Sequence, residues 1–237
     1  METNSLCSII IASFRQHTSL PLAIRSALNQ TYPNVEVIVV PVKTDKPTLR
    51  ALLDFLVGVE VKVVFSDRAD YVYQRKLGVQ NSTGKWFKFL DSDDYLMPSA
   101  VQSDMAVALK EKAYVVYSPL LAGDQHFNVV DFIKTEPFSY EALTKNCFIT
   151  DGSLTLKAMF HEFGLDERKG DMAFYEFWLR IAEKYPDRIR MNPYPTLVYC
   201  QHPDQMSRQV PKAERVRRRN MVVAESLQRM RKKDGNP

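Results

Sequence analysis

The chain has 237 residues, of which 45% are hydrophobic and 25% charged, values that are ordinary for a globular protein with one sizeable core. No run approaches the roughly 18 apolar residues of a membrane span, and the N-terminus lacks the basic segment of a secretory signal, so we expect a cytoplasmic protein. The net charge of +4 hides a basic tail: residues 212–237 hold nine basic and three acidic residues, leaving 23 of the 32 basic and 25 of the 28 acidic residues elsewhere. Because nucleic-acid-binding proteins more often spread their basic residues over the folded face, nucleic acid is not the expected partner.

Short apolar runs alternate with helical segments in the first half of the chain. Strands are expected at 7–12, 35–40, 61–65 and 86–90, and helices at 19–29, 49–57 and 71–79. This alternation predicts an α/β fold with parallel strands between helices. Ligands of such sheets bind beyond the carboxyl ends of the strands, where Ser13-Phe14-Arg15 and Asp91-Ser92-Asp93-Asp94 fall.

The pattern loosens after Val116. A hairpin is expected at Gly123-Asp124, a short helix at 140–145 and a stronger helix at 171–184, whereas 154–160 fits either state. The sequence shows no internal repeat and no low-complexity linker. We therefore expect one continuous domain over 1–208, followed by a helical tail over 209–237.

The stretch KWFKFLDSDDYLMP, from Lys85 to Pro98, ends an aromatic strand in three carboxylates. Like charges at this spacing repel unless a positive group lies among them. One interpretation is that an acid or Ser92 caps the next helix, which explains one carboxylate and leaves two. The other is a divalent cation held by oxygen ligands and shared with an anionic ligand.

Several motifs together resemble one known family. SIIIASFRQ, SALNQTYPNVEVIVV and STGKWFKFLDSDDYLMP occur in that family's order, followed by GLDERKG, YEFWLRIAEKY and YCQHPDQMS. The family is the inverting glycosyltransferases of family 2, and the resemblance covers about 5–208. It implies the GT-A fold, with a Rossmann-like, mostly parallel central sheet flanked by helices. The nucleotide-sugar-binding half would be 1–118 and the acceptor-side half 119–208.

The resemblance also implies an activity. A sugar would pass from a nucleotide diphosphate donor, first of all a UDP-sugar, to a hydroxyl of a glycan, lipid-linked or protein-linked acceptor. Asp93 would bind Mn²⁺ or Mg²⁺, which neutralises the diphosphate as it leaves, and His202 resembles the family's late histidine that reaches the metal or diphosphate. His202 could equally be a loop histidine with an ordinary hydrogen bond.

Other residues resemble the family's nucleotide site. They are Ala12, Ser13, Phe14 and Arg15 after the first strand, Arg75 and Lys76 in the third helix, and Asp91 and Ser92 after the fourth strand. Alternatively, Phe14 packs in the core, and Arg75 and Lys76 form a solvated helix face. The family's uracil-reading acid is missing, because Pro41 to Asp45 replaces its Asp-Asp-Gly-Ser; Asp45 or Asp67 could substitute.

The family's general base is also displaced. Its Glu-Asp pair stands four or five residues before the helix tryptophan, and this spacing from Trp178 reaches Ala173 and Phe174. Inverting transfer needs a carboxylate that accepts the acceptor's proton, a contribution of about 10² to 10⁴ in rate. Asp171 and Glu176 are the candidates, and we favour Asp171, whose alternative role is to cap the helix.

Two alternatives to this base remain open. The proton could pass to Asp151 or Asp166, or the chain could be a catalytically impaired relative that still binds nucleotide sugars. The tail poses a separate choice. Val216, Val223, Leu227 and Met230 recur at helical spacing, so an amphipathic tail helix either docks onto the domain or contacts an anionic membrane surface.

Overall fold

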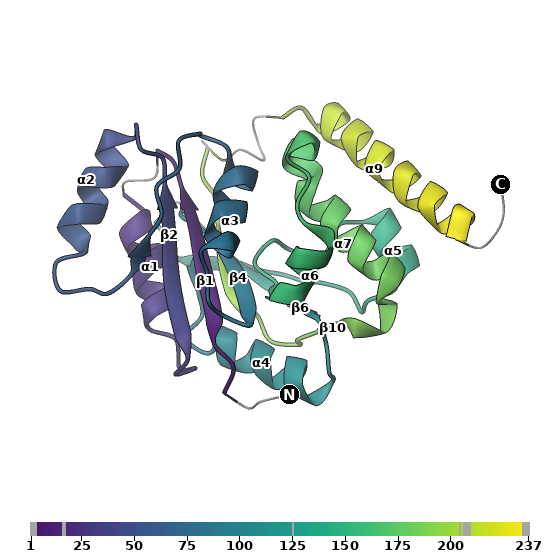
Figure 1. Ribbon diagram of the computed structural model, residues 1–237, viewed down its shortest axis with the longest axis horizontal. Coiled ribbons are helices and arrows are strands. Elements are labelled where there is room, and N and C mark those ends of the chain that lie inside the picture. Colours follow the sequence, from purple (N-terminus) through teal and green to yellow (C-terminus); the bar gives the residue numbers. More distant parts are fainter. Residues whose placement is uncertain (1–3, 16–17, 125, 204, 206–209, 234–237) are drawn as a thin grey trace.

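A central sheet runs through the computed structural model, which describes residues 4–15, 18–124, 126–203, 205 and 210–233 (Figure 1). Within these ranges the sheet has seven strands in the order β10-β6-β9-β4-β1-β2-β3. Their bounds are β1 Cys7–Ser13, β2 Val35–Pro41, β3 Lys62–Val63, β4 Trp86–Asp91, β6 Val115–Tyr117, β9 Leu154–Leu156 and β10 Ile189–Met191. Strand β1 pairs parallel with β2 and β4, whereas β9 runs antiparallel between β4 and β6. The predicted mostly parallel sheet is confirmed.

Helices cover both faces of the sheet, and β1 shows why. Its side chains alternate between two buried clusters, Ile10 in one and Ile9 and Ile11 in the other. The first cluster also contains residues of α3 and α7, and the second contains residues of α1 and α4. The helices are α1 Leu20–Leu28, α2 Lys46–Phe55, α3 Tyr71–Gln80, α4 Ala100–Lys110, α5 Tyr140–Lys145, α6 Lys157–Phe163, α7 Ala173–Lys184 and α9 Lys212–Lys233, with 3-10 turns η1 Glu167–Met172 and η2 Pro186–Arg188.

The structure also contains a second sheet of four strands. Its strands are β5 Tyr95–Leu96, β11 Leu197–Cys200, β7 Leu120–Gly123 and β8 Val129–Ile133, in that order. Strands β7 and β8 form the expected hairpin at Gly123-Asp124, where the Asp124 amide donates to the Asn128 carbonyl at 2.9 Å. Because β11 pairs with both β5 and β7, the segment after β11 is brought back to the turn that follows β4.

Some predicted boundaries differ from the observed ones. Helix α2 begins before 49, because the Asp45 side chain accepts from the Thr48 amide and caps it. The ambiguous segment contains both β9 and α6. Helix α7 begins at Ala173, not at 171, because Gly170 has φ 51° and ψ −123°, a conformation that interrupts the helix and favours glycine.

The C-terminal helix α9 packs against α7 and η1 (Figure 1). Val222 and Ser226 are its buried residues, and Val223 packs against the core. Val216 and Leu227, predicted to share the docking face with Val223, are 41% exposed each. The predicted boundary between 208 and 209 lies outside the described residues. Across the described ranges, no helix combines the length and apolar character needed to cross a membrane.

Candidate active site at the carboxyl edge of the sheet

The acidic cluster follows directly from the end of β4. Asp91 is its last residue, and the Asp94 amide donates to the Asp91 carbonyl at 3.1 Å, closing a tight turn. The turn brings carboxylate oxygens of Asp91, Asp93 and Asp94 within 4.8 Å of one another. Ser92 is buried in the same turn. The sequence pattern therefore becomes a single concentrated patch of negative charge.

The surroundings of the cluster disfavour the ionised forms of Asp93 and Asp94. Burial raises the pKa of Asp94 well above its usual range, and the charges of Asp91 and Asp93 raise it further. The pKa of Asp93 is raised by burial and by Asp91, while its hydrogen bond with His202 acts in the opposite direction. A bound cation would relieve the repulsion between these carboxylates.

His202 lies beside the acidic cluster. Its Nε2 lies 2.8 Å from Oδ2 of Asp93, although 109 positions separate the two residues. Asp94 Oδ1 accepts the amide of Cys200 at 2.8 Å, which fastens the end of β11 to the turn. Asp91, Asp93 and Asp94 each have a carboxylate oxygen that could bind a metal, and the imidazole of His202 lies beside Asp93. Oxygen donors with one imidazole fit Mg²⁺ or Mn²⁺.

Arg75 lies under the cluster and is almost fully buried. Its guanidinium forms an ion pair with Asp91 and donates from Nη1 to Oδ2 of Asp151 at 2.7 Å. The rings of Tyr71, Phe89 and Phe174 surround it, at 5.2, 5.3 and 4.6 Å from the guanidinium carbon. The interpretation of Arg75 as a solvated helix face is therefore wrong.

Lys76 forms an ion pair outside the cluster. Its ammonium pairs with Glu167 of η1, and Arg68 pairs with the same carboxylate at 2.9 Å. Arg75 and Lys76 are neighbours in sequence, yet the structure brings only Arg75 into contact with the acidic cluster.

The end of β1 lies beside the cluster, since Ala12 is the register partner of Asp91. Ser13 is buried, and its hydroxyl has no hydrogen-bond partner among the described residues. Phe14 is 38% exposed and carries the Arg15 guanidinium over its ring at 4.9 Å, so core packing of Phe14 is wrong. Arg15 has φ 58°, and its amide donates to Asp45 Oδ2 at 2.5 Å.

A model of the glycosyl transferase family 2 matches residues 8–164. The chain belongs to glycosyl transferase family 2. A glycosyltransferase of Rickettsia conorii is 28% identical over 198 residues, which is 77% of this chain and 32% of that relative. The UDP-Glc:alpha-D-GlcNAc-diphosphoundecaprenol beta-1,3-glucosyltransferase WfgD of Escherichia coli is 27% identical over 152 residues, 64% of this chain and 59% of that relative. The chain thus spans about a third of the length of the first relative and about three fifths of the length of the second.

Solved structures show the same fold. Staphylococcus aureus TarS 1–349 in complex with UDP-GlcNAc superposes with a TM-score of 0.73 at 15% identity, covering 93% of this chain and 66% of that one. The mannosyltransferase PcManGT of Pyrobaculum calidifontis in complex with GDP-Man and Mn²⁺ gives 0.65 at 13% identity, covering 91% and 61%. The family and the GT-A fold implied by the resemblance are confirmed.

The two acids favoured as general base are each held by an arginine. Asp171 is in η1, where Arg218 of α9 donates to its Oδ1 at 2.9 Å. It does not cap α7, because Met172 occupies that position. The Glu176 side chain is 7% exposed and accepts from Arg180 at 2.8 Å. Their assignment stays a prediction, and these ion pairs do not favour it.

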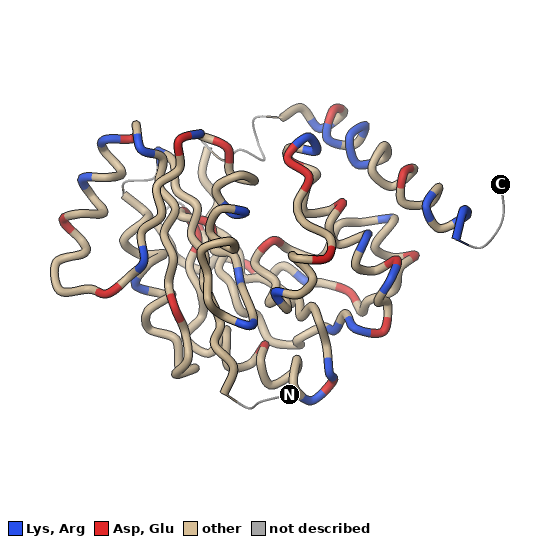
Figure 2. The backbone as a smooth tube through the Cα atoms, viewed as in Figure 1, with Lys and Arg blue, Asp and Glu red and all other residues tan. Residues whose placement is uncertain are grey.

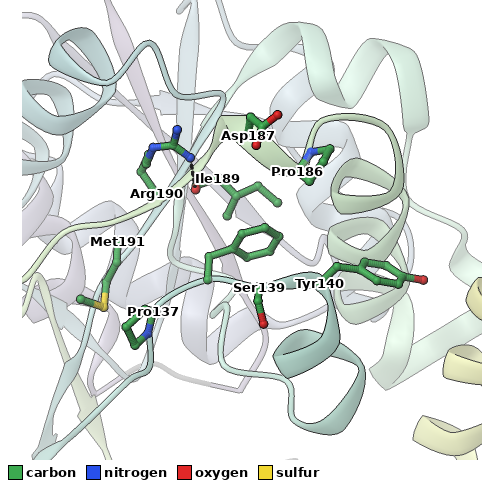
Figure 3. A pocket seen from close by; sticks show the side chains of 9 residues that line it. Pro137, Ser139, Tyr140, Pro186, Asp187, Ile189, Arg190 and Met191 are labelled. Atoms are coloured by element: carbon green, nitrogen blue, oxygen red, sulfur yellow. Dashed lines mark hydrogen bonds between the residues drawn. The ribbon is translucent and has the colours of Figure 1, made fainter.

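The pocket in Figure 3 is not part of this site. It has a volume of about 430 Å³ and lies between residues 137–140 and residues 186–191. None of the site residues predicted from the sequence, all of which fall in the described ranges, lines it. This pocket is therefore separate from the acidic cluster at the edge of the sheet.

Proposed function

We propose that the protein is a metal-dependent, inverting glycosyltransferase that uses a UDP-sugar. The observation that carries the proposal is the meeting of Asp91, Asp93 and His202 at the carboxyl end of β4, above the buried Arg75. The complexes of structural neighbours with UDP-GlcNAc and with GDP-Man and Mn²⁺ support the donor class. The glucosyltransferase relatives, which act on UDP-Glc, favour uridine.

Each end of the donor has candidate partners. The exposed ring of Phe14 offers a surface for the base, and Asp91 is proposed to contact the ribose. Asp93 and His202 would hold Mn²⁺ or Mg²⁺, which would neutralise the negative charge of the departing diphosphate. Asp45, whose Oδ2 accepts from the Arg15 amide, is the candidate to contact the uracil ring in place of the family acid that is missing here.

Inverting transfer then needs a single displacement. The acceptor oxygen attacks the anomeric carbon from the face opposite the diphosphate. The bond between that carbon and the diphosphate oxygen breaks, and this oxygen keeps the electron pair. A carboxylate of the protein takes the acceptor's proton as the new bond forms.

Isothermal calorimetry with UDP tests the proposal. With Mn²⁺ present, the full chain should bind UDP at least about tenfold more tightly than in EDTA, equivalent to about 1.4 kcal/mol. GDP under the same conditions should bind more weakly. Equal UDP affinity with and without metal would contradict the metal assignment, and tighter binding of GDP would contradict the choice of uridine.

A lipid-linked acceptor is the acceptor class that we propose. Two relatives act on GlcNAc-diphosphoundecaprenol. Helix α9 carries Lys and Arg along its length (Figure 2) together with the exposed apolar residues Val216, Met221 and Leu227. A helix with exposed basic and apolar groups suits an anionic membrane surface.

We expect a chain that ends at Val210 to retain UDP binding and lose stability. Helix α9 contributes the buried Val222 and the pairs of Arg229 with Glu183 at 2.7 Å and of Glu225 with Lys169 at 2.6 Å, none of which touches the acidic cluster. Its loss should lower the free energy of unfolding by about 2 kcal/mol or more. Urea unfolding and calorimetry with UDP measure the two effects, and loss of UDP affinity in a folded chain would show that α9 belongs to the donor site.

A further inference from the structure

Asp151 reaches the acidic edge of the sheet from the second half of the chain. Strand β9 runs antiparallel to β4, with Thr155 paired to Phe87. Continued toward the end of β4, the same register brings Asp151 level with Asp91. The contacts agree with this placement, since both carboxylates bind the guanidinium of Arg75.

The Asp151 carboxylate is held on one side and open on the other. Its Oδ2 accepts from Arg75 at 2.7 Å. Within the described part of the chain, its Oδ1 has no hydrogen-bond partner, and the side chain is 37% exposed. A carboxylate in this arrangement has a fixed orientation and a free oxygen that can accept a proton.

Phe174 occupies the sequence position of the family's missing acid, four residues before Trp178. Its ring centre is 4.6 Å from the guanidinium carbon of Arg75, the group that Asp151 binds from another side. The space around Arg75 therefore lacks a carboxylate from α7 and gains one from the loop before β9.

We infer that Asp151 is a catalytic residue, the carboxylate that accepts the acceptor's proton in place of the acid displaced from α7. The inference rests on the proposed function. In the step, the acceptor oxygen forms a bond to the anomeric carbon and its O–H bond breaks. The proton passes to Asp151, and the diphosphate leaves with the electron pair of the broken glycosyl bond.

Other acids near the site are less suited to this role. Asp166 is bound by Arg168 through two nitrogens at 2.9 Å each. Asp171 is bound by Arg218, and Glu176 is buried against Arg180. Of these carboxylates and Asp151, only Asp151 contacts a residue that also binds the acidic cluster.

The test measures UDP released from UDP-glucose and UDP-GlcNAc in Mn²⁺, with water as acceptor, because water also has to give up a proton. Asp151→Asn keeps the shape and an oxygen that can accept from Arg75. We expect it to bind UDP as the wild type does and to release UDP about 10²-fold or more slowly. Asp151→Ala should be equally slow and should recover at least tenfold when formate is added, since formate can occupy the vacated space and take the proton.

Matched variants separate this role from a structural one. Asp131→Asn, which changes an exposed carboxylate of β8 outside the site, should release UDP at a rate near the wild type. Weakened UDP binding in Asp151→Asn, or slow release from Asp151→Ala that formate does not restore, would assign Asp151 to holding Arg75 and overturn the inference. Loss of release in Asp171→Asn alone would make Asp171 the base and overturn it also. If the wild type neither binds UDP with Mn²⁺ nor releases it, the proposed function fails and the inference with it.

Discussion

Replacement of Asp93 by alanine should abolish metal-dependent UDP binding and leave the fold intact. The carboxylate is one of the oxygen ligands proposed for the cation, and loss of a supporting group alone typically costs 10- to 100-fold in metal affinity, so we expect a loss of about 100-fold or more. The fold should survive, because Asp93 lies within 4.8 Å of two other carboxylates whose repulsion its removal relieves. Calorimetry with UDP, in Mn²⁺ and in EDTA, measures the effect.

Two comparisons make the Asp93 experiment specific. The control variant Asp131→Ala, which removes an exposed carboxylate of β8, should bind UDP with Mn²⁺ as tightly as the wild type does. UDP affinity in EDTA should be the same for wild type and Asp93→Ala, since no metal is then present to be lost. A Mn²⁺-dependent gain in affinity that persists in Asp93→Ala would remove Asp93 from the metal site.

The second large effect is expected from Arg75→Met. Methionine replaces the length of the side chain but leaves Asp91 and Asp151 without their shared cation. Breaking a fully buried ion pair costs about 3–5 kcal/mol. Because the two carboxylates are 45% and 37% exposed and gain some hydration, we expect about 2–3 kcal/mol here, with urea unfolding as the measurement.

Arg75→Lys is the companion variant. It restores the charge but not the planar group that binds two carboxylates at once, so its stability should fall between those of Arg75→Met and the wild type. Equal stability of Arg75→Met and the wild type would show that Asp91 and Asp151 do not depend on Arg75 in the folded protein.

Local patterns predicted the part of the fold that carries the acidic cluster. Strands β1, β2 and β4 are continuous apolar runs with clear turn signals, so their ends and the polar residues beyond them could be placed from the sequence. The proximity of Asp93 and His202 was implied by the family resemblance alone, because 109 positions separate them. Helix and strand periodicity does not indicate which distant residues come together, whereas the family's order of motifs does.

The acidic residues in the second half of the chain bind partners that are distant in sequence, so local patterns could not predict these contacts. Asp171 binds Arg218 of α9, and Asp151 owes its place to the register of β9, a strand of three residues with an ambiguous pattern. The docking face of α9 was misplaced for a related reason. Ser226 is fully buried there, with its hydroxyl 2.8 Å from that of Tyr140, so the buried stripe includes a polar residue that hydrophobic spacing does not mark.

The position of β9 has a consequence for how the protein forms during synthesis. The strand lies between β4 and β6, so β1, β2, β3, β4 and β6 are all synthesised before the segment that joins β4 to β6. Until Leu154 to Leu156 emerge, the apolar β4 has an open edge whose backbone groups can pair with another chain. We therefore expect nascent chains that have not reached this segment to be prone to aggregation.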